Sequence, residues 1–157
     1  MSRARWKLSI QVDESLRSRV RKSWLRKAAM KALSAERVPA PAELSLVVTT
    51  DEVMEELNRT YRGVDRTTDV LAFPLDGSTP DFPPLPDGGR HLGEVIISGP
   101  QAARQAKEQA HQLREELSLL VIHGVLHLLG YEDEDPEKEP RMRAREAEIL
   151  KLTLEEK

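Results

Sequence analysis

The sequence predicts an α+β fold: a single domain with a small mixed sheet of about four strands packed against helices. Its 157 residues are the length of one domain. Apolar residues make up 39% and charged residues 32% of the chain, a balance typical of a folded globular protein. Segments with strand-like alternation are interspersed with segments of helical period. We therefore expect residues 1–157 to form one domain around one core.

The first two predicted elements are a strand and an amphipathic helix. Residues 6–13 alternate between apolar and polar side chains, as a half-buried strand does. In residues 15–33 an apolar side chain recurs at every fourth position, which predicts one helix with a buried face. These positions are Leu16, Val20, Trp24, Ala28 and Ala32. Pro39 and Pro41 end this unit.

A second strand and a second helix follow. Residues 44–48 form a short apolar run typical of a strand. Thr49 and Glu52 have the spacing of a capping box, so a helix is expected to begin there and to continue to Tyr61.

Two more strands flank a long loop. Residues 70–73 predict a short strand that stops before Pro74. Residues 74–90 contain five of the ten prolines, which predicts a surface loop and not a linker between domains. Residues 92–98 predict the fourth strand.

Helices are predicted for the remainder of the chain, over residues 101–112, 113–129 and 140–152. Within the second of these, residues 117–129 have apolar side chains at nine of thirteen positions, which predicts a central helix buried on most of its surface. Gly130 is a suitable residue to end that helix.

Charge is distributed unevenly along the chain, although the net charge is only -3. Residues 1–50 carry a balance of +7, residues 51–100 of -6 and residues 101–157 of -4. Most of the basic residues of the first third lie in the predicted helix over residues 15–33. This segment is either a surface that binds an anion such as nucleic acid or an ordinary solvated helix face.

The chain has no cysteine, which excludes disulfides, thiolate metal sites and a thiol nucleophile. Any bound metal must therefore be held by histidines and carboxylates. The sequence has no apolar run long enough to span a bilayer, and residues 1–10 lack the apolar stretch of a signal peptide. We therefore expect a cytoplasmic protein without a membrane partner.

Two histidines in the apolar helix predict a metal site. His123 and His127 are four residues apart, so they stack on one face about one turn apart. This is the spacing by which two imidazoles bind one metal ion from a helix. The chain then turns at Gly130 and can return a third ligand from the acidic residues 132–135. The alternative is a pair of core histidines that hydrogen-bond to their neighbours.

The residue after the first histidine bears on the chemistry. Metallopeptidases with this spacing place a glutamate there as general base, whereas this chain has Gly124. A peptidase of that type would lack its base.

The segment HGVLHLLGYED at residues 123–133 resembles the pattern HGxLHLxGxDH of the YbeY family of rRNA maturation endoribonucleases. Further segments resemble other motifs of that family in the same order and spacing. They are NRTYRG at 58–63, TDVLAFP at 68–74, LGEVII at 92–97 and EAEIL at 146–150. The resemblance extends from residue 44 to residue 152.

The resemblance implies one zinc ion, Zn2+, held by His123, His127 and the residue at position 133. The family has a histidine at that position, whereas this chain has Asp133. Two histidines and one carboxylate also hold catalytic zinc, so a three-ligand site is kept. The extra negative charge makes the metal a weaker Lewis acid, and the oxygen ligand admits other divalent metals. Glu132 or Glu134 is an alternative third ligand.

The resemblance also implies a metal-dependent, single-strand-specific endoribonuclease that acts in small-subunit rRNA 3′-end maturation and ribosome quality control. Its partners would be single-stranded RNA, rRNA and the small ribosomal subunit. Arg62, in the segment that resembles the family's YRG motif, would bind a phosphodiester through its guanidinium. Two alternatives remain: a non-catalytic ribosome-assembly factor with a structural metal, and a metallohydrolase of another substrate.

Overall fold

The computed structural model describes residues 6–75 and 90–155, which form one α+β domain. Its strands are β1 (Trp6–Val12), β2 (Ala42–Thr49), β3 (Val70–Pro74) and β4 (Arg90–Ser98). Its helices are a short 3-10 turn η1 (Glu14–Leu16), α1 (Lys22–Ala35), α2 (Asp51–Arg62), α3 (Gly99–Glu108), α4 (Leu113–Leu128) and α5 (Glu139–Glu155). None of the helices in this described part is both long and apolar enough to cross a membrane.

The four strands form one sheet in the order β1-β2-β4-β3. β1 pairs with β2 and β2 with β4 in parallel, whereas β3 pairs antiparallel with β4. The predicted mixed sheet of about four strands is therefore confirmed for the described residues. β3 is an edge strand, which is why it includes Pro74 although the sequence predicted that the strand would stop before it.

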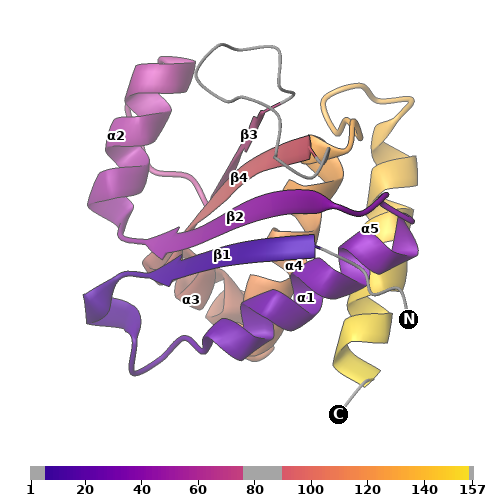
Figure 1. The fold of residues 1–157 in the computed structure, drawn as a ribbon. Helices are drawn as coiled ribbons and strands as arrows, with labels where there is room; N and C mark the ends of the chain where they lie inside the picture. Colours follow the sequence, from indigo (N-terminus) through magenta and orange to yellow (C-terminus); the bar gives the residue numbers. More distant parts are fainter. Residues whose placement is uncertain (1–5, 76–89, 156–157) are drawn as a thin grey trace.

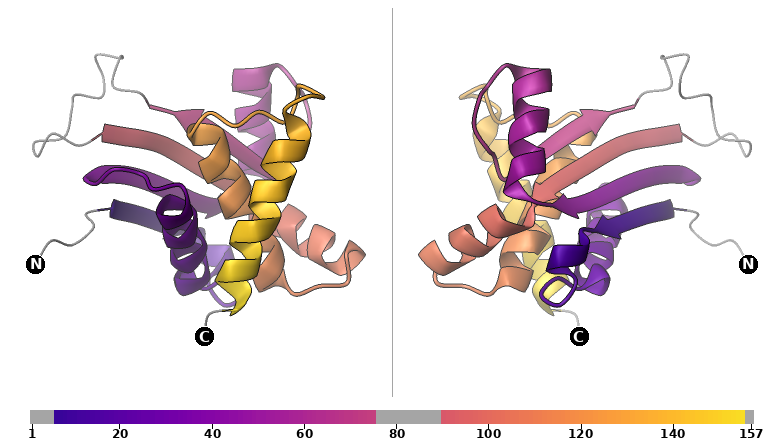
Figure 2. Two further views of the ribbon diagram at one scale, coloured as in Figure 1. Left: turned by 90° about the vertical axis from the view of Figure 1, so that its right-hand side faces the viewer. Right: turned by 90° about the vertical axis from the view of Figure 1, so that its left-hand side faces the viewer.

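Helices cover both faces of the sheet, unequally (Figures 1 and 2). On one face α2 packs alone, with Met54 against Leu71 and Ile96. The main core lies on the other face, where α1 and α4 pack on the sheet and α3 and α5 pack on α4. α4 is central to this layer, as its apolar sequence predicts, because sheet and helices surround most of it.

Gly124 explains how closely α4 approaches the sheet. A Cβ atom at this position would lie 2.5 Å from Cγ1 of Val95 on β4. Any larger residue would therefore push α4 away from the sheet, which would displace the face of α4 that carries the two histidines.

The prediction of one helix over residues 15–33 is wrong at its start. The side chain of Asp13 accepts a hydrogen bond from the backbone N–H of Ser15 and starts the η1 turn, and α1 begins only at Lys22. Leu16 and Val20 are nevertheless buried. Because turns and helices can place side chains on the core with the same spacing, the periodicity alone did not locate the start of the helix.

Other boundaries shift because a neighbouring hydroxyl caps the helix. Thr50 and not Thr49 caps α2, with its Oγ1 accepting from the backbone N–H of Val53. Ser98 caps α3 through the N–H of Gln101, so α3 begins two residues earlier than predicted. The predicted loop over residues 74–90 falls largely on residues 76–89, which lie outside the described residues.

Candidate metal centre

α4 presents His123 and His127 on one face, one turn apart. Their side chains are 25% and 31% exposed, so both reach the surface although most of the helix is buried. Their ring centroids lie 4.7 Å apart. The two imidazoles thus face the same small volume, as the spacing of four residues predicts.

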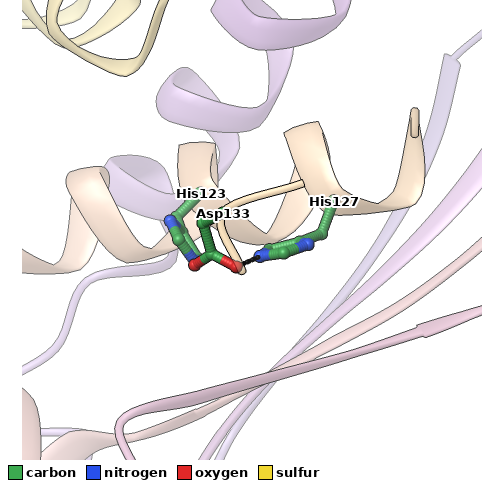
Figure 3. Close-up of side chains that lie close together, drawn as sticks. All are labelled: His123, His127 and Asp133. Atoms are coloured by element: carbon green, nitrogen blue, oxygen red, sulfur yellow. Dashed lines mark ion pairs between the residues drawn. The ribbon is translucent and has the colours of Figure 1, made fainter. Parts of the chain in front are cut away.

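The chain turns back after α4 and brings Asp133 to the two histidines. Gly130 has a φ of 102°, in the region that favours glycine, and the N–H of Tyr131 donates to the carbonyl of Leu126. Figure 3 shows the Asp133 carboxylate between the two rings. Its Oδ2 lies 3.4 Å from Nε2 of His123, and its Oδ1 lies 3.4 Å from Nε2 of His127.

These three side chains are suited to hold a divalent metal ion. One ligand atom from each lies within 4.8 Å of the others, and among the described residues no other cluster of histidines and acidic residues meets this condition. Two imidazole nitrogens and a carboxylate oxygen form a donor set used by catalytic zinc. Because all three side chains border an open cleft, a fourth coordination position would face the solvent.

The neighbouring carboxylates are not part of this group. Glu132 is exposed and lies 3.6 Å from Nζ of Lys138, and Glu134 is also exposed. The geometry favours Asp133 as the third ligand over either of them.

Glu146 on α5 is a site residue that our reading of the sequence missed. Its carboxylate accepts a hydrogen bond from Nδ1 of His123, which leaves Nε2 of that ring toward Asp133. Carboxylates in this position fix the tautomer and orientation of a metal-binding histidine. The sequence held a signal for it, because Glu146 occupies a position of the buried stripe of α5 that also contains Met142, Ile149 and Thr153.

The charge around His123 alters its protonation in the metal-free protein. Burial lowers the pKa of the imidazole, but the hydrogen bond to Glu146 and the negative charges of Glu146, Asp133 and Asp69 raise it above its ordinary value. Protons and a metal ion therefore compete for this ring.

Arg62 lines the same cleft as the two histidines and Asp133. It is the last residue of α2 and is exposed, and Gly63 ends the helix with a φ of 70°. The cleft has a volume of about 590 Å³ and also includes Asp69. None of the basic residues of segment 15–33 lines it, so the structure separates that segment from the predicted site residues.

Comparisons with known proteins assign the chain to a family. The sequence model of the family "Endoribonuclease YbeY" matches residues 8–153. A protein of that name from Chloroflexus aurantiacus is 41% identical over 146 residues, covering 92% of this chain and 94% of its own length. Its namesake from Moorella thermoacetica is 47% identical over 130 residues, covering 82% and 83%.

A solved structure supports the fold. The solution structure of TM1509 from Thermotoga maritima has a TM-score of 0.63 and 23% identity, and covers 95% of this chain and 90% of that one. The family match spans nearly the whole chain, and its range includes His123, His127 and Asp133. On this evidence the chain belongs to the YbeY family of endoribonucleases.

Proposed function

We propose that this protein is a metal-dependent, single-strand-specific endoribonuclease whose single domain comprises residues 1–157. The observation that carries the proposal is the group formed by His123, His127 and Asp133 at the wall of a cleft that Arg62 also lines. A nuclease needs a centre that stabilises charge on a phosphodiester and a group that positions it. In this proposal the metal held by the three side chains would supply the first and Arg62 the second, and all four residues line one cleft.

In this proposal the three ligands hold one Zn2+ ion, with other divalent metals as possible occupants because Asp133 is an oxygen ligand. The metal, when bound, supplies a Lewis acid that polarises water or a phosphate oxygen. Arg62 binds the phosphodiester through its guanidinium and orients it in the cleft. Glu146 holds the ring of His123 so that Nε2 faces the centre.

We further propose that the substrate is rRNA, in small-subunit 3′-end maturation and ribosome quality control, and that the protein acts in the cytoplasm with the small ribosomal subunit as partner. The support is the likeness of the family motifs at residues 58–63, 68–74 and 123–133.

The test is cleavage of single-stranded RNA by purified protein with and without a chelator, alongside the same sequence in duplex form. We expect the chelator and the His127→Ala substitution each to abolish cleavage, and the duplex to remain intact. Cleavage that persists unchanged in both His123→Ala and His127→Ala would show that the site is misassigned.

Two other outcomes identify the alternatives. If chelation lowers the melting temperature while RNA stays intact and the protein still sediments with small subunits, the metal is structural in an assembly factor. If small phosphoesters or peptides turn over and RNA does not, the protein is a hydrolase of another substrate.

A further inference from the structure

A second hollow shares one lining residue, Tyr131, with the metal cleft. It has a volume of about 450 Å³ and lies between the C-terminal end of α1 and α5, two elements that pack side by side. Tyr131 lines both this hollow and the metal cleft. A ligand that extends from the cleft past Tyr131 would therefore enter it.

The wall of the hollow is held in place by a polar network centred on Glu36. The Oη of Tyr131 donates to Oε1 of Glu36 at 2.8 Å, and Nε of Arg145 donates to its Oε2 at 2.5 Å. Arg145 also donates to the carbonyl of Ala35 at 2.7 Å. The Glu36 side chain is 13% exposed. Its charge is therefore neutralised by Arg145, and its hydrogen bond holds the side chain of Tyr131, which lines both cavities.

Two further arginines line the hollow without a carboxylate partner. The guanidinium of Arg141 lies 5.3 Å from the centroid of the Tyr131 ring, and Arg37 is exposed. Among the described residues neither arginine forms an ion pair, and the two carboxylates that line the hollow, Glu36 and Glu148, both pair with Arg145. The hollow therefore retains positive charge after its internal pairs are counted.

This charge contrasts with the metal cleft. Four carboxylates line the cleft, from Asp69, Glu132, Asp133 and Glu134, and they oppose the approach of a polyanion. A nucleic acid chain in the cleft would gain most from cations placed just beyond these carboxylates. A guanidinium binds phosphate oxygens through paired hydrogen bonds and also stacks on unpaired bases.

We propose that Arg37 and Arg141 form a subsite for the phosphodiester backbone of single-stranded RNA next to the cleaved bond. This inference rests on the proposed function for the identity of the strand. It adds that the strand passes Tyr131 and that the two arginines contribute affinity and not chemistry.

The test measures RNA binding by metal-free protein, so that no cleavage occurs during the measurement. The probe is a fluorescently labelled single-stranded RNA of about 12 nucleotides, and anisotropy gives the affinity over a series of salt concentrations. For the double variant Arg37→Gln/Arg141→Gln we expect affinity about tenfold weaker at low salt and a salt slope smaller by about 1.4, because each lost phosphate contact removes about 0.7.

Arg143→Gln is the matched control. It removes one positive charge from the helix that carries Arg141, at an exposed residue that pairs with Glu139 and does not line the hollow. We expect its affinity within about twofold of the parent. Melting temperatures of all variants establish that they are folded.

The inference is overturned if the double variant binds RNA as Arg143→Gln does, or if the parent protein does not bind the probe even at low salt. An acidic protein as the true ligand of the hollow would give the first result. Failure of the proposed function is separate, since it would appear as absent cleavage by the metal-loaded parent, whereas weaker binding by the metal-free double variant would still be observed.

Discussion

The two ends of α4 each bring histidine together with carboxylates, but they are built differently. Just before the helix begins, Nδ1 of His111 lies 3.1 Å from Glu115 and its Nε2 lies 2.7 Å from Glu116. Near the other end, His123 and His127 direct their Nε2 atoms to the one carboxylate of Asp133. In the first cluster two carboxylates contact the nitrogens of a single imidazole, whereas in the second two imidazoles face one carboxylate.

This difference shows why only one cluster is suited to hold a metal ion. At the start of α4 both ring nitrogens of His111 are engaged, and Glu116 also accepts from Nε2 of Gln105 at 2.8 Å. At the end of α4, Glu146 engages Nδ1 of His123, and Nε2 of that ring faces Asp133, the same carboxylate that Nε2 of His127 faces. A second imidazole one turn along the helix, and not the number of acidic residues, therefore distinguishes the candidate metal centre from the cluster around His111.

Removal of one imidazole should abolish metal binding in the second cluster and leave it unchanged in the first. This is the largest effect we expect. His127→Ala removes a ligand, so bound zinc should fall well below one ion per chain, with a loss of affinity beyond about 100-fold, and RNA cleavage should be lost. His111→Ala should keep both the metal and the activity. Elemental analysis and an RNA cleavage assay measure the two properties. Equal metal loss in both variants would contradict the distinction.

The third ligand gives the next largest effect. Asp133→Ala should lower the metal content to well below one ion per chain, because the neighbouring Glu132 is drawn toward Lys138. Asp133→His should retain the metal, since it restores a nitrogen donor at the same place in the chain. Elemental analysis of both purified variants decides the matter. Full metal content in Asp133→Ala would mean that another group is the third ligand.

Much of this site could be predicted from the sequence because its geometry is local. The spacing of His123 and His127 on a helix fixes how they lie, and Gly130 marks where the chain turns back. Glu146 was missed because it comes from another helix, and sequence spacing within α4 carries no information on what α5 places against it. The separation of the basic segment 15–33 from the cleft is likewise a tertiary property.

The contribution of Glu146 should be intermediate. Glu146→Gln keeps the size of the side chain but removes the charge that orients the His123 ring, and loss of such a partner typically lowers metal affinity about 10–100-fold. Competition with a chelating dye measures the affinity. Glu148→Gln is the control, because it lies on the same helix, is 65% exposed and contacts Arg145 instead. If Glu146→Gln binds the metal as tightly as Glu148→Gln does, Glu146 does not contribute to metal binding.

The fold shows the same division between local and tertiary information. The alternation in β1 and the apolar run of α4 predicted a strand and a buried helix because period and burial coincide there. The start of α1 was misplaced because Leu16 and Val20 are buried although they precede the helix. They lie in and after the turn that Asp13 initiates. Sequence patterns therefore identified which side chains are buried more reliably than which hydroxyl or carboxylate caps a helix.

At the N-terminal end of α4, the cluster around His111 should contribute to the stability of the protein and not to metal binding. Glu116 is 5% exposed and accepts hydrogen bonds from both His111 and Gln105, so Glu116→Ala leaves two partners unsatisfied. We expect a loss of about 1–3 kcal/mol, with the melting temperature lowered by about 2–4 °C for each kcal/mol. Thermal unfolding measures this. Glu115→Ala, at a residue whose side chain is 36% exposed, should change stability by less than about 0.5 kcal/mol.

The smallest effect is a pH dependence at the metal end, in protein freed of metal by a chelator. Burial lowers the pKa of His123, but Glu146, Asp133 and Asp69 raise it above the ordinary value of 6.5. A pKa raised by folding stabilises the folded state fully below the unfolded value, and this stabilisation is lost as the pH rises through the folded value.

The difference in melting temperature between the parent and Glu146→Gln should therefore be largest below the ordinary pKa of 6.5 and should shrink as the pH rises above it. Glu146 is the strongest of the groups that raise this pKa, so its removal isolates the contribution of His123 from those of other titrating residues. Calorimetry on both proteins at pH values below and above 6.5 measures the difference. If the difference in melting temperature does not vary with pH, Glu146 does not stabilise the protonated ring of His123 in the metal-free protein. The contrast between the two ends of α4 would then rest on the number of imidazoles alone.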